Sequence, residues 1–477
     1  MIKFINKNDL LDLPLVIGAF SDEKISVLGS FSNDLNELVE EKIISLEKNK
    51  INKIPTFKKI ANKTVYVVGL GKKGEYSIRG LEGAVKALTL GADSDLVIDS
   101  KTFIDSLDEF DALRAMIDIN SYYEYSYEEC KSVKKAKKYT FNVLTDYKDI
   151  KALDEYFNLY EIVNKTRDLV NKPYNYLSAE DLANYAVAMC ERLKSDKVKY
   201  KIYEKEEIKA LGMNAFLGVN KGSVAKPKLI YLEYNGKDED LTALVGKGLM
   251  YDTGGYDLKS SMATMKNDMA GAATVLGIFE AIVTNKIKRN ISVVICATDN
   301  RINGEALLPD DVLTAMNKKT IEIISTDAEG RLTLADAVCF AESKNAKRII
   351  DLATLTGAVV TALGDYTTGI LGNDQKLIDD IIEASKIANE HLWQLPITDF
   401  IREKVRKSDV ADVKNASGRG MGVSSAAAFI EEFISATTSW AHLDIAGTAH
   451  LTSPFYQEAP GATGVMVKTL YKYLKDN

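Results

Sequence analysis

The segment Leu241-Thr-Ala-Leu-Val-Gly-Lys-Gly-Leu-Met-Tyr-Asp-Thr-Gly-Gly255 decides the fold class of this protein. An apolar run typical of a β-strand leads directly into a loop that its glycines make conformationally permissive. Similar apolar runs recur along the chain, with helical patterns between most of them. This alternation is typical of parallel or mixed sheets covered by helices, so the sequence predicts an α/β fold.

Further strands are predicted on both sides of this segment. They are KLIYLEY (228–234), ISVVICAT (291–298), IEIIST (321–326), KRIIDLAT (347–354) and WAHLDIAG (440–447). In open α/β sheets, ligands bind beyond the carboxyl ends of the strands. The active site is therefore expected just after these runs.

The length of the chain, 477 residues, predicts two or three domains at roughly 100–200 residues per domain. A helical pattern covers residues 151–171 and is broken by Pro173. We expect a domain boundary on or beside this helix. The prediction is an N-terminal α/β domain over residues 1–160 and a second α/β domain over residues 161–477.

Local signals predict several elements near this boundary and before it. KISVLG (24–29) and KTVYVVGLG (63–71) are predicted strands, and RGLEGAVKALTLGA (79–92) is a predicted helix ending at a glycine. The stretch LSAEDLANYAVAMCERL (177–193) predicts another helix. Its first turn combines Ser178 as the N-cap with Asp181.

Composition excludes some classes of partner. Lys and Arg number 61 against 68 Asp and Glu, a net charge of −7, which disfavours general attraction to nucleic acid or to an anionic membrane. The apolar runs are all shorter than the roughly 18–20 residues needed to span a bilayer. The N-terminal stretch contains Asp9 and Asp12 and lacks a small-residue cleavage site, so we expect a cytoplasmic protein.

Charged side chains concentrate in three loops of the second domain. The first loop carries Lys247, Asp252 and Lys259. Asp268 opens the helical stretch NDMAGAATVLGIFEA, and Asp327-Ala-Glu-Gly-Arg331 lies between IEIIST and the helical stretch LTLADAVCFAE. Strand ends would thus receive four carboxylates together with two lysines and one arginine.

Four clustered carboxylates cannot all remain ionised without a countercharge, because each raises the pKa of the others. Divalent cations would supply that charge. The three histidines, His391, His442 and His450, all lie in the last fifth of the chain, so oxygen ligands for two ions of Mg²⁺, Mn²⁺, Co²⁺ or Zn²⁺ are expected. The alternative is that the acids cap helices and form surface ion pairs with Lys247 and Arg331.

These loops also resemble a known family. VGKGLMYDTGGYDLK (245–259), MKNDMAGAATVLG (265–277) and STDAEGRLTLADAV (325–338) are similar to signature segments of the cytosolic leucyl aminopeptidases, the two-metal exopeptidases of the M17 peptidase family. Further similar segments include DLATLTGAVVTALG (351–364), NASGRGMGVSSAAAFIEEFI (415–434) and WAHLDIAGTAH (440–450). The resemblance covers about residues 165–477.

The resemblance implies roles for individual residues. One metal ion would be bound by Lys247, Asp252, Asp268 and Glu329, and the other by Asp252, Asp327 and Glu329. Lys259 would stabilise the oxyanion that develops on the scissile carbonyl. Arg331 resembles the arginine that holds a bicarbonate ion acting as general base. The free α-amine of the substrate would bind a metal ion, which restricts cleavage to the N-terminus.

The same matching implies a pocket for the first side chain of the substrate. Its residues would be Met265, Thr354, Leu355, Gly357, Ala446 and Ala449, with the Leu355 carbonyl contacting the substrate. Core packing is the alternative for Met265 and the two alanines. The chain departs from the family between Lys259 and Asp268, where it is two residues shorter and has Ser260 in place of the usual proline.

The resemblance further implies a homo-hexamer that acts on peptides with a free N-terminus. Two other functions remain open. One is dinucleotide binding, because Gly69, Gly71 and Gly74 form a GxGxxG pattern after a predicted strand, with Asp99 further on. The other is DNA binding through the lysine cluster at positions 131, 134, 135, 137 and 138.

Overall fold

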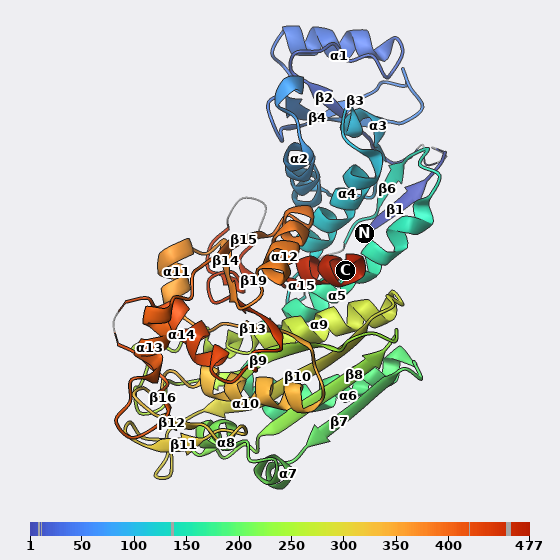
Figure 1. The fold of residues 1–477 in the computed structure, drawn as a ribbon. Helices are drawn as coiled ribbons and strands as arrows, with labels where there is room; N and C mark the ends of the chain where they lie inside the picture. The colour runs from blue at the N-terminus through green and yellow to red at the C-terminus, as the bar shows by residue number, and fades with distance from the viewer. Residues whose placement is uncertain (8–9, 11, 135–137, 419, 455–458) are drawn as a thin grey trace. The chain divides into compact units, whose positions relative to one another are not determined.

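The computed structural model describes residues 1–477 except 8–9, 11, 135–137, 419 and 455–458. The chain forms two compact units, shown in Figure 1. Unit 1 comprises Met1–Asn164 with Pro454 and Ala459, and unit 2 comprises Lys165–Ser453 and Pro460–Asn477. Helix α5, Asp154–Asn171, carries the chain from one unit into the other. Both units combine a sheet with helices, which confirms the predicted α/β class.

Unit 1 is built on a six-stranded sheet of order β1-β6-β5-β2-β4-β3, in which only the β3–β4 pair is antiparallel. In sheet order, the strands are Ile2–Ile5, Phe141–Leu144, Leu96–Asp99, Leu15–Phe20, Thr64–Gly71 and Ile51–Pro55. The helices of this unit before α5 are α1 Phe31–Glu40, α2 Ile78–Gly91, α3 Lys101–Ile104 and α4 Glu109–Glu124.

One predicted strand of unit 1 is wrong. The segment KISVLG (24–29) forms no strand, because side chains of α1 bind its backbone. Asn36 accepts from the Ile25 N–H and donates to the Ile25 carbonyl, both at 2.9 Å, and the Leu28 N–H donates to Ser32 Oγ. The strand of this region is β2 instead, nine residues earlier in the chain.

Two of the GxGxxG glycines, Gly69 and Gly71, serve packing within unit 1, whereas a Cβ at Gly74 would meet nothing within 4 Å. A Cβ at Gly69 would lie 2.2 Å from the Glu47 carbonyl oxygen, and the Gly71 N–H donates to the Leu46 carbonyl. Helix α2 begins only at Ile78, after a short turn that follows Gly71. The segment at residues 46–50 therefore occupies the space and the backbone N–H groups beside Gly69 and Gly71, where a dinucleotide phosphate would approach. In the basic cluster, positions 131, 134 and 138 are exposed, and positions 135 and 137 lie outside the described residues.

Unit 2 is built on an eight-stranded mixed sheet of order β15-β14-β17-β13-β9-β10-β8-β7. The central strands β17, β13, β9 and β10 are parallel. In sheet order, the strands are His391–Gln394, Thr367–Gly372, Ser439–Asp444, Arg348–Ala353, Thr242–Asp252, Asn290–Asn300, Lys228–Asn235 and Val198–Tyr203. The parallel centre places the carboxyl ends of four strands along one edge of the sheet.

The helices of unit 2 vary in length from six to fifteen residues. They are α6 Ala179–Leu193, α7 Lys205–Ala210, α8 Asn214–Asn220, α9 Ala270–Thr284, α10 Gly330–Ser343, α11 Gly357–Leu363, α12 Gln375–Ala388, α13 Asp399–Arg406, α14 Gly422–Glu431 and α15 Val467–Asp476. The predicted capping box of Ser178 and Asp181 is present at the start of α6. Among the described helices, none is long and apolar enough to cross a membrane.

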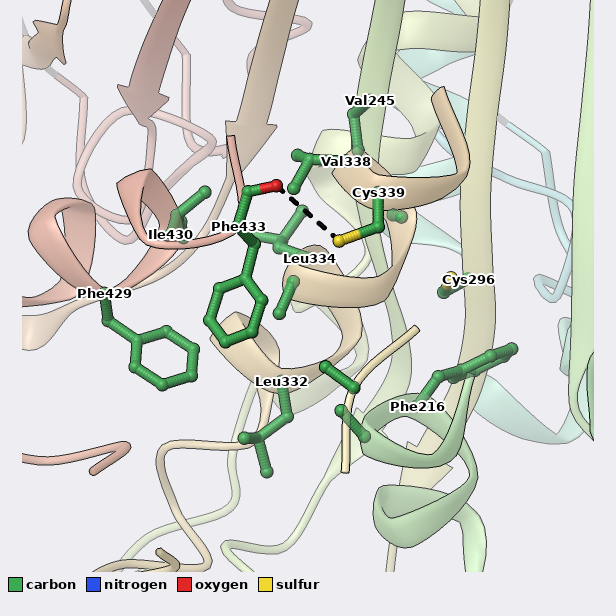
Figure 2. Packing of buried hydrophobic residues seen from close by; sticks show 14 of the residues in the cluster. Phe216, Val245, Cys296, Leu332, Leu334, Val338, Cys339, Phe429, Ile430 and Phe433 are labelled. Atoms are coloured by element: carbon green, nitrogen blue, oxygen red, sulfur yellow. Dashed lines mark hydrogen bonds between the residues drawn. The ribbon is translucent and has the colours of Figure 1, made fainter. Parts of the chain in front are cut away.

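Helices cover both faces of this sheet. On one face, Gly246 of β9 admits α9 so closely that a Cβ there would lie 2.7 Å from Ala272 Cα. The preceding residue, Val245, points to the opposite face, as alternation along a strand requires. There it joins the core cluster around α10, where Figure 2 shows the Cys339 thiol directed at the Phe433 carbonyl, 3.6 Å away. Helix α10 is thereby fixed between the sheet and α14.

The predicted strand IEIIST is confirmed only in part. Strand β12, Thr320–Glu322, belongs to a separate three-stranded sheet with β11, Val312–Thr314, and β16, Val413–Lys414. Residues after Glu322 leave the sheet and run toward α10 as a loop. A two-stranded pair, β18 His450–Leu451 with β19 Gly461–Ala462, completes the unit.

Candidate metal centre

Strand β9 provides two of the predicted ligands, Lys247 and Asp252. Regular alternation would place residues five positions apart on opposite faces of the sheet. However, Leu249 pairs with Thr298 and Asp252 pairs with Asn300, so β9 contains one extra residue in this interval. Such a bulge shifts the alternation and turns Asp252 to the side of Lys247.

The Asp252 carboxylate is held at the end of its strand. Its Oδ1 accepts hydrogen bonds from the Gly254 N–H at 2.8 Å and from Asn300 Nδ2 at 2.9 Å. Gly254 and Gly255 both have positive φ, which a side chain would strain, and this turn folds the following loop back over the strand end. The other carboxylate oxygen, Oδ2, remains directed toward Lys259 at 2.7 Å.

Lys247 lies buried at the centre of the acidic cluster. Its Nζ donates to Asp268 Oδ1 at 2.8 Å and to the Thr354 carbonyl at 2.9 Å, and it lies 3.2 Å from Glu329 Oε1. Burial lowers the pKa of Lys247, but the charges of Asp268, Glu329 and Asp252 outweigh burial and raise it. The amine is therefore protonated in the absence of a competing cation.

Asp268 lies just before α9 and is almost completely buried. Its Oδ1 also accepts a hydrogen bond from Thr354 Oγ1 at 2.8 Å. Its Oδ2 has no hydrogen-bond partner among the described residues. Burial raises the pKa of this carboxyl to about 8, against the opposing charge of Lys247.

Asp327 and Glu329 come from the loop that precedes α10. Asn415 orders this loop, because its Oδ1 accepts from the Ile324 N–H at 2.8 Å and its Nδ2 donates to the Ser325 carbonyl at 2.6 Å. Glu329 is the N-cap residue of α10 and is buried, and its Oε2 has no hydrogen-bond partner among the described residues. Burial also raises the pKa values of Asp327 and Glu329.

Lys259 reaches this acidic cluster in spite of the shorter segment that follows it. Its Nζ lies 2.7 Å from Asp252 Oδ2 and 2.5 Å from Asp327 Oδ1. Asp257 helps to fix this loop, because its N–H donates to Thr326 Oγ1 at 2.8 Å and its carboxylate accepts from the Thr326 N–H at 2.7 Å. Burial lowers the pKa of Lys259, but nearby carboxylates raise it overall.

The three carboxylates of Asp252, Asp327 and Glu329 have the geometry of a cation site. Each offers one oxygen, and these oxygens all lie within 4.8 Å of one another. The buried, unpartnered oxygens of Asp268 and Glu329 are further acceptors that a cation would satisfy. The residues present therefore fit a divalent metal with oxygen ligands, and Lys247 could add a nitrogen ligand after losing a proton.

Arg331 is half-buried in the first turn of α10. One terminal nitrogen donates to the Asn415 carbonyl at 2.6 Å, and its Nε has no hydrogen-bond partner among the described residues. Burial lowers the pKa of Arg331 to about 10, so the guanidinium remains charged at neutral pH.

The predicted pocket residues fall into two groups. Thr354 contacts Lys247 and Asp268, while the N–H groups of Leu355 and Ala446 both donate to Asp444, at 3.1 and 3.2 Å. The other three residues are placed by their own segments: Met265 begins a short 3₁₀ helix, Gly357 begins α11, and Ala449 is buried just before β18.

Sequence reasoning missed three residues that organise the centre: Asn300, Asn415 and Asp444. Asn300 and Asp444 stand at strand ends, so the rule that pointed to Asp252 applied equally to them. Asn415 gave no comparable signal, because its partners Ile324 and Ser325 lie about 90 residues earlier.

Comparisons with known proteins agree with this architecture. The model of the cytosol aminopeptidase family, catalytic domain, matches residues 164–471, and the model of the N-terminal domain of the same family matches residues 16–133. Two similar solved structures are named bottromycin maturation enzyme BotP and bottromycin maturation enzyme BotP in complex with Mn. Both are 28% identical to this chain and match 99% of their own length. They cover 97% and 98% of this chain with TM-scores of 0.85 and 0.86. The resemblance noted in the sequence is thus confirmed, and the chain belongs to the cytosol aminopeptidase family.

Proposed function

We propose that this protein is a metal-dependent aminopeptidase that hydrolyses peptides from their free N-terminus, releasing leucine and other residues. Two divalent ions per subunit would be held by the residues predicted from the sequence. One set is Lys247, Asp252, Asp268 and Glu329, and the other is Asp252, Asp327 and Glu329. The observation that carries this proposal is the acidic cluster of Asp252, Asp327 and Glu329, in which three carboxylate oxygens lie within 4.8 Å of one another and two of the three residues are buried.

The ionic state of the cluster supports the binding of cations. Two ammonium groups, those of Lys247 and Lys259, supply the positive charge that balances the carboxylates in the structure. Divalent ions would take over this role and compete with both amines. Because a structure of BotP is a complex with Mn, Mn²⁺ is the first ion to test, followed by Zn²⁺, Co²⁺ and Mg²⁺.

Bound divalent ions lower the pKa of a coordinated water and polarise a carbonyl group. The protein's own side chains would supply the remaining catalytic interactions. Lys259, once displaced from Asp252 and Asp327, is close enough to these ligands to donate to the oxyanion of the scissile carbonyl. In the metal-free structure the neighbouring carboxylates raise the pKa of Lys259, so the side chain enters the site as an ammonium.

Arg331 is proposed to hold bicarbonate as the general base. Its side chain is half-buried, charged and anchored to Asn415 through one nitrogen, and Nε, which has no hydrogen-bond partner among the described residues, is left for an anion. The pocket for the first side chain is proposed to include Met265, Thr354, Leu355, Gly357, Ala446 and Ala449. We also assign residues 161–477 as the catalytic domain and residues 1–160 as a variable domain, and the active form as a cytoplasmic homo-hexamer.

The deciding experiment compares two peptides with Mn²⁺-loaded protein. One has a free N-terminal leucine, and the other is identical but acetylated. If the α-amine is a metal ligand, the free peptide is shortened one residue at a time and the acetylated peptide resists. Mass spectrometry of both digests distinguishes the cases, and internal cleavage of the acetylated peptide would overturn the proposal.

A further inference from the structure

One buried carboxylate, that of Asp444, joins two segments that contain predicted substrate-binding residues. Asp444 ends β17 and is completely buried. Its Oδ1 accepts from the backbone N–H groups of Leu355, at 3.1 Å, and Ala446, at 3.2 Å. Its Oδ2 accepts from Thr356 Oγ1 at 2.7 Å. The same hydroxyl accepts from the Val359 N–H and so caps α11.

The loop after β13 is held from its other side by the candidate metal ligands. The Thr354 carbonyl accepts from Lys247, and Thr354 Oγ1 donates to Asp268. Thr354 is therefore hydrogen-bonded to the candidate metal ligands, and the next two residues, Leu355 and Thr356, are hydrogen-bonded to Asp444. A carboxylate accepting several hydrogen bonds resists displacement, because losing it would leave buried N–H groups unsatisfied.

A second group of buried polar side chains lies on the same strand as Asp444 and on its neighbour β13. His442 lies two residues earlier on the same strand and therefore on the same face. Its Nδ1 donates to Asp351 Oδ1 at 2.6 Å, and Trp440 Nε1 donates to Asp351 Oδ2 at 2.7 Å. Asp351 pairs with His442 in the parallel β13–β17 register. These side chains are buried, so the pairing of β13 with β17 has little freedom to shift.

We infer that Asp444 is a positioning residue: it fixes the backbones of Leu355 and Ala446, and hence the place of the substrate's first residue, without contacting a predicted metal ligand or the substrate. The inference rests on the proposed function for the identity of the substrate. It extends that function, because it attributes the geometry of the substrate pocket to a residue that does not line the pocket.

The test compares Asp444→Ala and Asp444→Asn with a matched control, Glu390→Ala. Glu390 also accepts from two backbone N–H groups and one threonine hydroxyl, those of Met466 and Thr469, but it lies beside the edge strand β15. Asp444→Ala should raise KM for leucine amide about 10- to 100-fold, because pocket contacts with the substrate's first side chain that are made equally in the ground and transition states are lost. The value of kcat should change less than about threefold, and Mn²⁺ affinity should stay within about twofold.

Asp444→Asn retains a carbonyl oxygen for the Leu355 and Ala446 N–H groups, so it should recover most of the KM. Glu390→Ala should leave KM unchanged. An unchanged KM in Asp444→Ala, an equal rise in the Glu390 control, or a loss of Mn²⁺ affinity would each overturn the inference. If Asp444→Ala does not fold, Thr356→Val deletes one of the three hydrogen bonds to Asp444 together with the cap of α11 and should give a smaller rise in KM, whereas a parental KM in that variant would overturn the inference.

A second measurement is independent of any activity. Amide hydrogen exchange at residues 354–357 and 446–449 should accelerate in Asp444→Ala and not in Glu390→Ala. If the parent protein cleaves no aminoacyl substrate but shows this pattern, the proposed function fails and the positioning role stands. Unchanged exchange in both segments would remove the positioning role even if the enzyme is active.

Discussion

Gly330 leaves the space that the Lys247 side chain fills: a Cβ at position 330 would lie 2.3 Å from Lys247 Cε and 2.6 Å from its Nζ. The first residue of α10 therefore cannot be larger than glycine without displacing a predicted ligand. Since Lys247 is fixed to Asp268 and Thr354, it has little room to move. The start of α10 and a predicted metal ligand are thus coupled, because position 330 has no Cβ.

Gly330→Ala should weaken Mn²⁺ binding by at least about tenfold and lower activity in parallel. Gly304→Ala is the matched control, because nothing lies within 4 Å of a Cβ at that position and its backbone needs no positive φ. Isothermal titration with Mn²⁺ measures both variants. Parental Mn²⁺ affinity in Gly330→Ala would show that Lys247 is not a ligand.

Exhaustive chelation should abolish peptidase activity, because the proposed mechanism activates a water that divalent ions coordinate. Addition of Mn²⁺, Co²⁺ or Zn²⁺ should restore it. The measurement is hydrolysis of leucine amide by protein whose metal content is checked by mass spectrometry. Full activity in protein free of metal would refute the metal-dependent mechanism.

Asp252→Ala and Lys259→Ala should separate metal binding from turnover. Asp252 has hydrogen bonds that aim it into the cluster, so its loss should remove metal and activity together. Lys259→Ala removes an ammonium that competes with the metal, so it should bind Mn²⁺ at least as tightly while kcat falls about 10²–10³-fold, as for the loss of an oxyanion donor. Parental turnover in Lys259→Ala would contradict its assigned role.

The stability of the metal-free protein should decrease as the pH rises toward 8, in part because of Asp268. Its pKa in the folded protein is about 8, whereas an unfolded aspartate titrates near 4, so between these values the folded state holds the extra proton. The stabilisation from this group is complete below about pH 4 and is lost as the pH passes 8. Thermal denaturation in chelator from pH 5 to 8 should show a flatter trend for Asp268→Asn than for the parent. Equal slopes would contradict the buried, protonated carboxyl.

The contribution of Arg331 to activity should depend on dissolved carbonate. Removing dissolved carbonate should slow the parent, while Arg331→Ala should be slow and insensitive to carbonate. Arg331→Lys retains the charge but not the Nε donor, and it serves as the comparison. Equal carbonate dependence in parent and Arg331→Ala would exclude this arginine as the anion site.

Sequence patterns predicted helices and strands well where contacts within the same segment determine the structure. The helix at 177–193 carries its own capping box, and Ser178 and Asp181 form it as expected. The segment KISVLG has strand-like composition, but Asn36 and Ser32 of a neighbouring helix take up its backbone hydrogen bonds. No property of residues 24–29 alone shows this, because the competing partner lies outside the window.

The candidate site also has features that the sequence predicted and features that only the structure shows. The strand-end rule and the excess of acids pointed to Asp252, Asp327 and Glu329, which the structure brings together, while their roles as ligands stay predictions. The bulge that turns Asp252 toward Lys247 depends on the register with β10, which the sequence of β9 does not contain. Asn415 and Asp444 act through backbone groups of distant segments, so their importance becomes visible only in three dimensions.

The dependence of the 324–331 loop on Asn415 has a consequence for biosynthesis. All five predicted ligands leave the ribosome before Asn415, which follows its partner Ser325 by 90 residues. At a synthesis rate of roughly 5–20 residues per second, that interval lasts about 5–18 s. During this time the nascent chain contains the predicted carboxylate ligands but lacks Asn415, which orders the loop that carries Asp327 and Glu329. If the cluster binds metal ions as proposed, its ordered form would become available only after Asn415 has been synthesised.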